Sequence, residues 1–477
     1  MRTFKIPHVF IFLFWIIILC SVLSYVIPSG KYDRKPKDSQ KTKQTVVKPE
    51  SYTEIPKHYS LKSVLIGEEV EGKASPTSLL GVFAAIPKGL SDSAALVFYV
   101  FLIGAVFTLI HYTGALNAAL FSLIERFNTR PKQLFFILYI LVFSGSAFLG
   151  LLMEVIPLIP IFLFLAKRMG YDRMFGFGMV GVPIFLGWST GVTNPFTVLI
   201  AQSVAELPPG SGIGLRLVLY VVCAGLGFYF LMRYGERVRM NPSLSHLQDD
   251  PFNLEEYGNF EKVVLTRCHV RILGFFVASY AAILVAVQLL GWRLIEMSAC
   301  FVCIAIVVTF LAGMSGDEAM AALTKGLEIM IVPALVVGVA RGIYVVLQEA
   351  QVIDSILHYA SSSLMSMPLI IAGEGMLLFQ SVLNFFIPSA SGQALVSMPL
   401  MTPLSDILGL SRQTAVLAFI LGDGLSNIII PTNGVLMAML GVAKVPFEKW
   451  FKFVLPLFLA SMVVAMGFVA VAILTGY

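Results

Sequence analysis

Apolar runs of about twenty residues, the length that spans a membrane, recur along this sequence between shorter polar segments. An α-helix rises about 1.5 Å per residue, so such a run crosses a hydrocarbon layer roughly 30 Å thick. The clearest runs cover residues 9–28, 94–110, 213–232, 272–290, 294–311 and 453–474. The pattern predicts an all-α polytopic membrane protein, whose first run is an uncleaved helix rather than a signal peptide.

Five short patterns of the first half recur in the same order in the second half. AAIPKGL at 84–90 returns as AALTKGL at 321–327, FSGSA at 143–147 as FIPSA at 386–390, VIPLIP at 155–160 as SMPLMTP at 397–403, GYDR at 170–173 as GLSR at 409–412, and Thr193-Asn194 as Thr432-Asn433. The last two pairs share one offset, since 409 minus 170 and 432 minus 193 both equal 239. We therefore predict a duplicated chain built from two repeats.

Two long polar stretches divide the chain. The stretch at 30–75 is rich in Lys, Glu, Ser and Thr and is predicted to be an external loop. The other begins with Arg233, Arg237 and Arg239 directly after an apolar run, which favours the cytoplasmic side. The predicted divisions are a first repeat (1–232), a cytoplasmic linker (233–271), a linking transmembrane helix (272–292) and a second repeat (293–477).

Two weakly apolar stretches, 114–127 and 350–363, decide how the repeats are oriented. If they cross the membrane, six crossings per half and the linking helix put seven between equivalent points, and the repeats are inverted; if they lie flat, the repeats are parallel. We favour inversion, in a bacterial inner membrane with a cytoplasmic N-terminus. Arg168 and Arg233 then lie inside, as positive residues prefer, although Arg126 lies outside.

The segment from Pro388 to Gly409 has too few apolar residues for two full spans and starts and ends in polar residues. We interpret it as a re-entrant hairpin, with a half-helix in, a turn and a half-helix out. Irregular backbone at membrane depth is tolerated only where protein or a watery cavity satisfies it. Its candidate binding residues are Ser389, Ser391, Gly392 and Gln393, with Ser146 in the first repeat. The alternative is a close helix contact of small residues.

Two further helices carry polar residues and proline in mid-span, GWSTGVTNPFT at 187–197 and GDGLSNIIIPTNG at 422–434. Proline removes a donor and clashes with the preceding turn, so we expect breaks near Pro195 and Pro431. The N-terminal end of a half-helix exposes amide N–H groups that attract carboxylates, and the C-terminal end exposes carbonyls that attract cations. The added candidates for substrate binding are Thr193, Asn194, Thr197, Asn427, Thr432 and Asn433. Together, the hairpins and breaks predict one midplane site, the layout of a transporter.

The motifs PSASGQA, GLSR and DGLSNIIIPTNG, together with TGAL, make the chain resemble the anaerobic C4-dicarboxylate carrier (DcuC-like) and YfcC-like family of the ion transporter superfamily. The resemblance covers essentially the whole chain, although FSGSAFLG has no residue matching Gln393. It implies secondary transport of small organic acids or amino acids by alternating access, with an elevator-like motion and a homodimer. YfcC-like members are usually suggested to carry basic amino acids.

Four ionisable residues in predicted spans, Glu154, Glu374, Asp423 and Arg341, are costly in lipid and are expected to face a cavity or a partner. Three acids against one base favour an amino acid whose ammonium or guanidinium group they meet. Alternatively, Asp423 or Glu154 binds a coupling proton or Na⁺ and Arg341 meets a dicarboxylate, or Arg341 pairs structurally with Glu374. A Na⁺ site is expected near Ser146, Thr193, Asn194, Ser389, Thr432 and Asn433.

Composition and missing motifs exclude other classes. With 57% hydrophobic and 13% charged residues, 477 residues cannot hide their apolar surface in a soluble core, and the net charge of +5 lies mostly in loops, so no nucleic acid is expected. The sequence has no GxxxxGK[ST], HExxH or GxSxG motif, and no partner aspartate for GDG at 422–424, so no enzyme and no cofactor beyond a coupling ion is predicted. Cys300 and Cys303 form a lone CxxC, for which helix packing outweighs metal binding. A passive channel stays an alternative.

Overall fold

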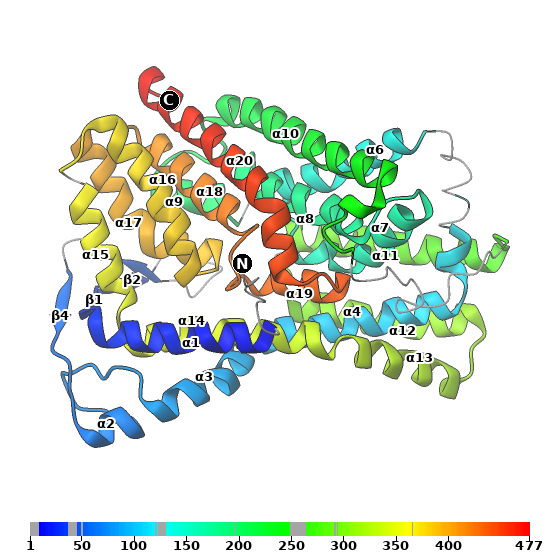
Figure 1. Ribbon diagram of the computed structural model, residues 1–477, viewed down its shortest axis with the longest axis horizontal. Coiled ribbons are helices and arrows are strands. Elements are labelled where there is room, and N and C mark those ends of the chain that lie inside the picture. Colours follow the sequence, from blue (N-terminus) through cyan, green and yellow to red (C-terminus); the bar gives the residue numbers. More distant parts are fainter. Residues whose placement is uncertain are drawn as a thin grey trace.

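The computed structural model describes residues 9–36, 45–48, 51–119, 122, 130–194, 196–248, 264–290, 292, 294–364 and 366–477. Helices dominate these residues, and two short two-stranded sheets accompany them (Figure 1). Among the described residues, the stretches long and apolar enough to cross a membrane number seven: Ala94–Tyr112, Pro131–Leu149, Ile213–Met240, Leu294–Ala312, Gly316–Glu349, Leu369–Phe386 and Phe447–Thr475. The mostly helical membrane protein predicted from the apolar runs is confirmed. The runs predicted at 9–28 and 272–290 are helical but are not among these seven.

The helices of the first half are α1 (Val9–Val26), α2 (Leu61–Leu65), α3 (Leu79–Asp92), α4 (Ala94–Tyr112), α6 (Pro131–Ser144), the π-helix η1 (Gly145–Leu149), the 3₁₀ helix η2 (Met153–Leu158), α7 (Ile159–Arg168), α8 (Arg173–Thr190), α9 (Val198–Val204) and α10 (Ile213–Met240). After the 3₁₀ turn η3 (Pro242–Leu244) come α11 (Arg267–Leu290), α12 (Leu294–Ala312), α13 (Gly316–Ile329), α14 (Ile331–Glu349), α15 (Ile353–Leu364), α16 (Leu369–Phe386), α17 (Ala390–Leu408), α18 (Arg412–Ser426), α19 (Gly434–Ala443) and α20 (Phe447–Thr475).

The repeated KGL motif lies where each half packs against the other. Helix α3 packs along α14, and α13 packs along α4 in the same way. A Cβ atom at Gly89 would lie 2.6 Å from the amide nitrogen of Gly342, and one at Gly326 would lie 2.5 Å from Cα of Ala105. These contacts are equivalent, since 326 minus 89 and 342 minus 105 both equal 237. The two halves thus exchange one pair of close helix contacts; their inverted insertion stays a prediction.

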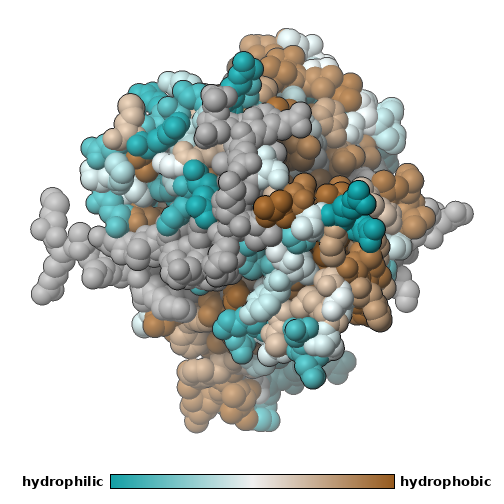
Figure 2. Space-filling model, turned by 90° about the vertical axis from the view of Figure 1, so that its right-hand side faces the viewer, coloured by the Kyte–Doolittle hydropathy of each residue, from teal (hydrophilic) through white to brown (hydrophobic). Residues whose placement is uncertain are grey.

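Figure 1 shows these helices in one layer along the lower edge of the view, with α1 and α3 toward one end and α12 and α13 toward the other. Helices α8, α9, α18 and α19, which flank the two interruptions described below, lie above this layer (Figure 1). Large apolar side chains on the outer helices stay exposed, Phe310 at 80% and Val463 at 69%. Figure 2 shows broad hydrophobic patches beside hydrophilic clusters on one end face of the molecule. Lipid, rather than water, is the solvent that such an apolar surface requires.

The two predicted breaks in mid-span helices are present. Helix α8 ends at Thr190 with Gly191 in the left-handed conformation (φ 45°), and α9 begins at Val198. Helix α18 ends at Ser426, and α19 begins after the cap residue Asn433, so the second interruption contains Pro431. The predicted cause of the first break, Pro195, lies outside the described residues.

The predicted half-helix, turn and half-helix between Pro388 and Gly409 is wrong. A single helix, α17, runs from Ala390 to Leu408, and the chain is irregular only before it, between Phe386 and the cap residue Ser389. The helix continues past Pro399 and Pro403 because neighbouring helices and short hydroxyl side chains can re-satisfy the main-chain groups that proline frees. The matching region of the first half differs, since it joins α6 to α7 through η1, a left-handed Gly150 and η2.

The polar insertion forms two small two-stranded sheets that contact the second half. Strand β1 (Ser29–Lys31) pairs with β4 (Thr53–Ile55), and β2 (Arg34–Pro36) pairs with β3 (Thr45–Val47), both antiparallel. Asp354 of α15 accepts a hydrogen bond from the Tyr32 amide at 2.9 Å and pairs with Arg34 at 2.8 Å. Burial, together with the Asp354 carboxylate, raises the pKa of Tyr32 to about 12, so its hydroxyl stays protonated. The external location of this insertion stays a prediction.

Two predicted features lie partly outside the described residues. The linker at 233–271 is described as far as residue 248 and again from 264, and the stretch at 114–127 only at 114–119 and 122. The second weakly apolar stretch, at 350–363, is largely occupied by helix α15. The division of the chain into repeats and linker therefore stays a prediction.

Candidate functional site

In the first half, the interruption between α8 and α9 folds back onto η1. The Thr193 hydroxyl donates to the Phe148 carbonyl at 2.9 Å, and the Asn194 side-chain amide donates to the Ser146 carbonyl at 3.3 Å. The Ser146 hydroxyl in turn donates to the Ile184 carbonyl of α8 at 2.7 Å. The structure thus brings together the first-half residues that the sequence singled out, and it uses their polar atoms to satisfy irregular backbone.

In the second half, Asn384 of α16 connects the residues of the second interruption. Its side-chain amide donates to the main-chain carbonyl of Asp423 at 2.9 Å, to the hydroxyl of Ser426 at 2.8 Å and to the side-chain oxygen of Asn427 at 3.0 Å. Asn433 also donates to that Asn427 oxygen, at 2.7 Å. Sequence reasoning missed Asn384, although an asparagine inside an apolar span is a detectable signal.

Gln393 of α17 contacts Gln380, which lies about one turn before Asn384 on α16. Its side-chain amide donates to the Gln380 carbonyl at 2.9 Å and to the Gln380 side-chain oxygen at 2.8 Å, and the Ser397 hydroxyl donates to that oxygen at 3.1 Å. Gln393 is fully buried, whereas Ser389 is exposed and Ser391 is half-buried. Within the PSASGQA motif, Gln393 is therefore buried against Gln380 of α16, whereas Ser389 and Ser391 lie nearer the surface.

The two interruptions meet where α8 crosses α18. A Cβ atom at Gly424 would lie 2.3 Å from Cα of Ser189, so only glycine permits this crossing. At the preceding residue of each helix, the Trp188 indole donates to Oδ2 of Asp423 at 3.2 Å, and the indole ring lies parallel to that of Phe196, 6.4 Å away. Asp423 is fully buried. The first half thus supplies the hydrogen bond to the buried carboxylate of the second half.

Several buried polar atoms around these interruptions have no hydrogen-bond partner among the described residues. They are Oδ1 of Asp423, Oδ1 of Asn384, Oε1 of Gln393, Nε2 of Gln380 and the hydroxyl oxygens of Thr197 and Thr432. Buried polar groups in folded proteins are almost always paired with protein or ordered water. A concentration of unpaired atoms at one crossing of helices identifies a place that a polar solute, an ion or water would complete.

The other three charged candidates do not join this cluster. The Arg341 side chain pairs with Oδ2 of Asp92 at 3.6 Å and stacks over the Tyr344 ring at 4.1 Å, so the alternative of an Arg341–Glu374 ion pair is wrong. The reason is that α14 packs along α3, which carries Asp92. Oε2 of Glu374 is buried without a partner among the described residues.

Glu154 lies in η2, where Oε2 accepts the main-chain amide of Leu152 at 2.8 Å. The Tyr280 hydroxyl of α11 donates to the main-chain carbonyl of Glu154. The carboxylate therefore stabilises an irregular turn, and helix α11 is tied to that turn. Of the four predicted charges, only Asp423 lies among the unpaired atoms at the helix crossing.

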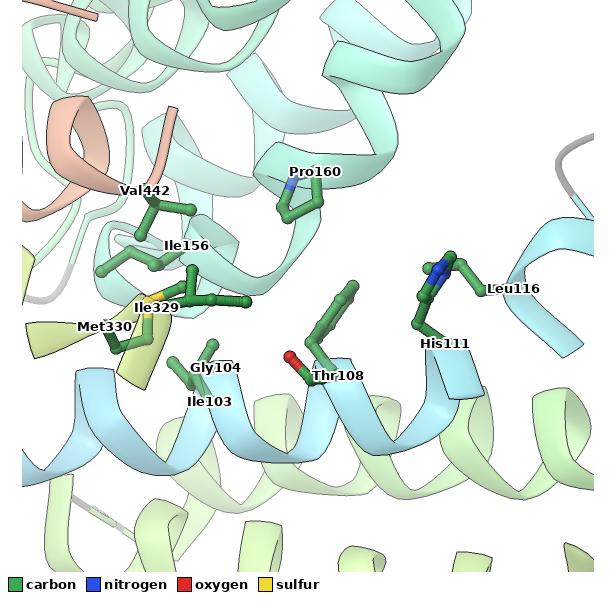
Figure 3. A pocket seen from close by; sticks show the side chains of 11 residues that line it. Ile103, Gly104, Thr108, His111, Leu116, Ile156, Pro160, Ile329, Met330 and Val442 are labelled. Carbon is green, nitrogen blue, oxygen red and sulfur yellow. The ribbon is translucent and has the colours of Figure 1, made fainter. Parts of the chain in front are cut away.

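A small cavity of about 40 Å³ separates α4 from η2, α7 and α19 (Figure 3). Thr108 and His111 of α4 face Pro160 across it, and Met330 closes one side. This volume holds a water molecule or two, far below the few hundred Å³ that a small-molecule site usually needs. His111 therefore lies at a helix interface.

No group of three or more His, Cys, Asp or Glu side chains within the described ranges could hold a metal ion. The oxygen atoms of the two interruptions come instead from amides, hydroxyls and carbonyls, with Asp423 as the one carboxylate of the cluster. Such neutral oxygens suit a weakly held Na⁺ better than a transition metal. The Na⁺ site predicted near Ser146 and Asn433 stays a prediction.

An apolar helical chain with two interrupted helices and a buried polar crossing is typical of a membrane carrier. The chain belongs to the C4-dicarboxylate anaerobic carrier (DcuC) family, which matches residues 6–474. It is therefore a member of a transporter family, and the sequence resemblance is confirmed.

Two relatives match along nearly their whole length. One, from Escherichia coli strain K12, carries the name "Putative basic amino acid antiporter YfcC" and is 32% identical over 94% of this chain and 93% of its own. The other, from Haemophilus influenzae, is 28% identical over 96% of this chain and 94% of its own. Two solved structures, the Alcanivorax borkumensis YdaH transporter and Neisseria gonorrhoeae MtrF, share 16% identity with it at TM-scores of 0.44 and 0.43 and cover 99% of this chain, and 99% and 96% of their own.

Proposed function

We propose that this protein is a secondary active transporter that moves a small carboxylate-bearing solute by alternating access, and that the solute is an amino acid. The observation that carries the proposal is the buried Asp423 carboxylate, which the Trp188 indole holds at the crossing of two interrupted helices while Oδ1 has no partner among the described residues. A buried carboxylate is costly unless a cation or donor completes it. A transported ammonium group or a coupling ion would supply that partner.

Substrate class follows from charge. Asp423 is the one carboxylate among the unpaired groups at the helix crossing, and Arg341, the predicted partner for a dicarboxylate, is already paired with Asp92. The site therefore suits a solute with a positive group better than one with two negative groups. The name of the Escherichia coli relative, a basic amino acid antiporter, supports exchange of such solutes.

A C4-dicarboxylate carrier coupled to Na⁺ or H⁺ is the second candidate, and the family name favours it. In that case Asp423 binds the coupling ion, and Ser146, Thr193, Asn194, Ser389, Thr432 and Asn433 supply neutral oxygens nearby. The substrate carboxylates would then meet main-chain amides at the start of α17 or α19. A passive channel is the third candidate.

We further infer a homodimer in a bacterial inner membrane, with the N-terminus in the cytoplasm, inverted repeats and an elevator-like movement of the interrupted helices. The arginines behind the α10 run support this orientation, since Arg233, Arg237 and Arg239 lie in its last turns. The reciprocal packing of α3 on α14 and of α13 on α4 supports two equivalent halves.

The deciding experiment is uptake by proteoliposomes that contain the purified full chain. Labelled L-arginine, L-lysine, succinate and fumarate are offered with an internal load of each compound, or with an imposed Na⁺ or H⁺ gradient. We expect saturable uptake of a basic amino acid that depends on internal amino acid. Gradient-driven uptake of succinate would favour the second candidate. Uncoupled conductance without saturable uptake would overturn transport by alternating access.

A further inference from the structure

Arg216 is a buried arginine that the proposed site does not use. It lies in the first turn of α10 and is 1% exposed. Its guanidinium donates to the Val192 carbonyl at 3.4 Å and to the Tyr477 hydroxyl at 3.1 Å, while Nε has no partner. No carboxylate of the described residues pairs with it. A buried guanidinium without an anion is unusual, because the cost of removing its charge from water is normally offset by an opposite charge.

Arg216 reaches into the first interruption. Val192 follows the left-handed Gly191 directly after α8. A Cβ atom at Gly191 would lie 3.4 Å from the Thr197 hydroxyl oxygen and 3.2 Å from the Ile420 side chain. Thr197 is fully buried, and its hydroxyl has no partner among the described residues. Two unpaired donors, one charged and one neutral, therefore border the same few residues of irregular chain.

The second interruption has the opposite character. Its unpaired side-chain atoms include three acceptors, Oδ1 of Asp423, Oδ1 of Asn384 and Oε1 of Gln393, beside two groups that can donate, Nε2 of Gln380 and the Thr432 hydroxyl. The two interruptions are close, because Gly191 contacts Ile420 and Trp188 contacts Asp423. Each member of one contact is three residues from its counterpart in the other, about one helical turn or ~5 Å along each helix. The unpaired donors beside Gly191 and Val192 thus lie about one helical turn from the unpaired oxygen of Asp423.

We propose that Arg216 and Thr197 bind the carboxylate of the transported solute, while Asp423 and its neighbours receive the positive group. This inference rests on the proposed function and deepens it by assigning the carboxylate. The Tyr477 hydroxyl occupies the guanidinium in this structure and also donates to the Gly212 carbonyl. A carboxylate oxygen takes the place of that hydroxyl when the interruption opens, since charged pairs form stronger hydrogen bonds than neutral ones.

The test combines deletion of the charge from the protein with deletion of the carboxylate from the probe. Binding is measured by thermal shift and by inhibition of uptake, with L-arginine and with agmatine, which lacks the carboxylate. Wild-type protein is expected to bind L-arginine about 10- to 100-fold more tightly than agmatine, as one charged hydrogen-bonded contact allows. In Arg216→Gln this ratio falls to near one, because L-arginine weakens while agmatine is unchanged.

Three variants control for folding and geometry. Arg216→Lys keeps the charge and is expected to restore part of the ratio. Thr197→Val removes one hydroxyl and is expected to lower the ratio about fivefold. The variant should stay folded, because this hydroxyl has no hydrogen-bond partner among the described residues. Arg412→Gln removes another arginine of the same region, which is paired with Asp406 and Glu206, and is expected to keep the wild-type ratio.

Each outcome decides between the two proposals. An unchanged ratio in Arg216→Gln, or in both Arg216→Lys and Thr197→Val if the glutamine variant does not fold, overturns the carboxylate assignment and leaves the transporter intact. Stabilisation by sodium phosphate that needs Arg216, with no discrimination between L-arginine and agmatine, identifies an inorganic anion site and also overturns it. If neither amino acids nor succinate bind the wild-type protein, the proposed function fails and the assignment fails with it.

Discussion

The indole nitrogen of Trp188 lies 3.2 Å from Oδ2 of Asp423 and is its donor across the interface between the two halves of the chain. The two residues lie on α8 and α18, which cross at the contact of Ser189 with Gly424. Because this hydrogen bond joins the equivalent interrupted helices, any movement that separates them must break it. The bond therefore couples the state of the carboxylate to the relative position of the two helices.

Replacing Trp188 with phenylalanine removes the donor and keeps most of the ring packing. We expect the apparent affinity for the solute to fall about tenfold or more, because a hydrogen bond to a charged group contributes about 1.5–3 kcal/mol. Concentration-dependent uptake in proteoliposomes measures this change. Trp15→Phe on α1, where the side chain is 61% exposed, is the matched control and should transport like wild type. Equal affinity in both variants would show that the bond has no part in binding.

Asp423→Asn keeps the shape of the side chain and removes its charge. If Asp423 binds the coupling ion, uptake loses its dependence on the Na⁺ or H⁺ gradient while exchange of pre-loaded solute continues. If Asp423 receives the positive group of the solute, both uptake and exchange of basic amino acids fall about 100-fold, as the loss of a charged contact of about 3 kcal/mol implies. Glu328→Gln, an exposed carboxylate on α13, is the control. Full transport with unchanged ion dependence would remove Asp423 from both roles.

The asparagines of the two interruptions hold irregular chain in place. Oδ1 of Asn433 accepts the amides of Val435 and Leu436 at the start of α19, and the Asn194 side chain bridges to η1. Asn433→Ala is expected to cost about 1 kcal/mol of stability, the usual contribution of a helix cap, and to abolish uptake while the protein stays folded in the membrane. Asn194→Ala is expected to abolish uptake as well.

Uptake assays with size-exclusion profiles of the purified variants check this expectation. Wild-type transport by both asparagine variants would remove the interruptions from the mechanism.

The repeated glycines of the KGL motif support the packing between halves. Gly89→Ala and Gly326→Ala each place a methyl group about 2.3–2.6 Å from backbone atoms of the opposite half, where no side chain can yield. We expect each to lower stability by about 1–3 kcal/mol, the range for overpacking in a tight core. Thermal unfolding of the purified protein measures this loss. Gly467→Ala on α20 meets no atom within 4 Å and should be neutral or slightly stabilising. A neutral effect at both motif glycines would contradict the close packing.

Local pattern was enough for features that depend on single stretches of chain. Apolar runs predict the spanning helices, because a helix that crosses lipid needs a fixed length of apolar residues. The Thr-Asn motifs with proline predict the two interruptions, because polar residues and proline in mid-span are tolerated only where the helix opens. The repeated motifs predict two halves, and the reciprocal contacts of Gly89 and Gly326 agree. The single helix α17 was not predicted, since neighbours decide whether Pro399 and Pro403 break a helix.

The sequence by itself determined that this chain is a membrane protein with two interrupted helices, because these properties follow from hydropathy and local backbone chemistry. Tertiary structure decided which polar groups meet. It joined Trp188 to Asp423, placed Asn384 between the residues of the second interruption and paired Arg341 with Asp92. Partners that lie on different helices depend on how those helices rotate and pack, and no pattern within one helix contains that information.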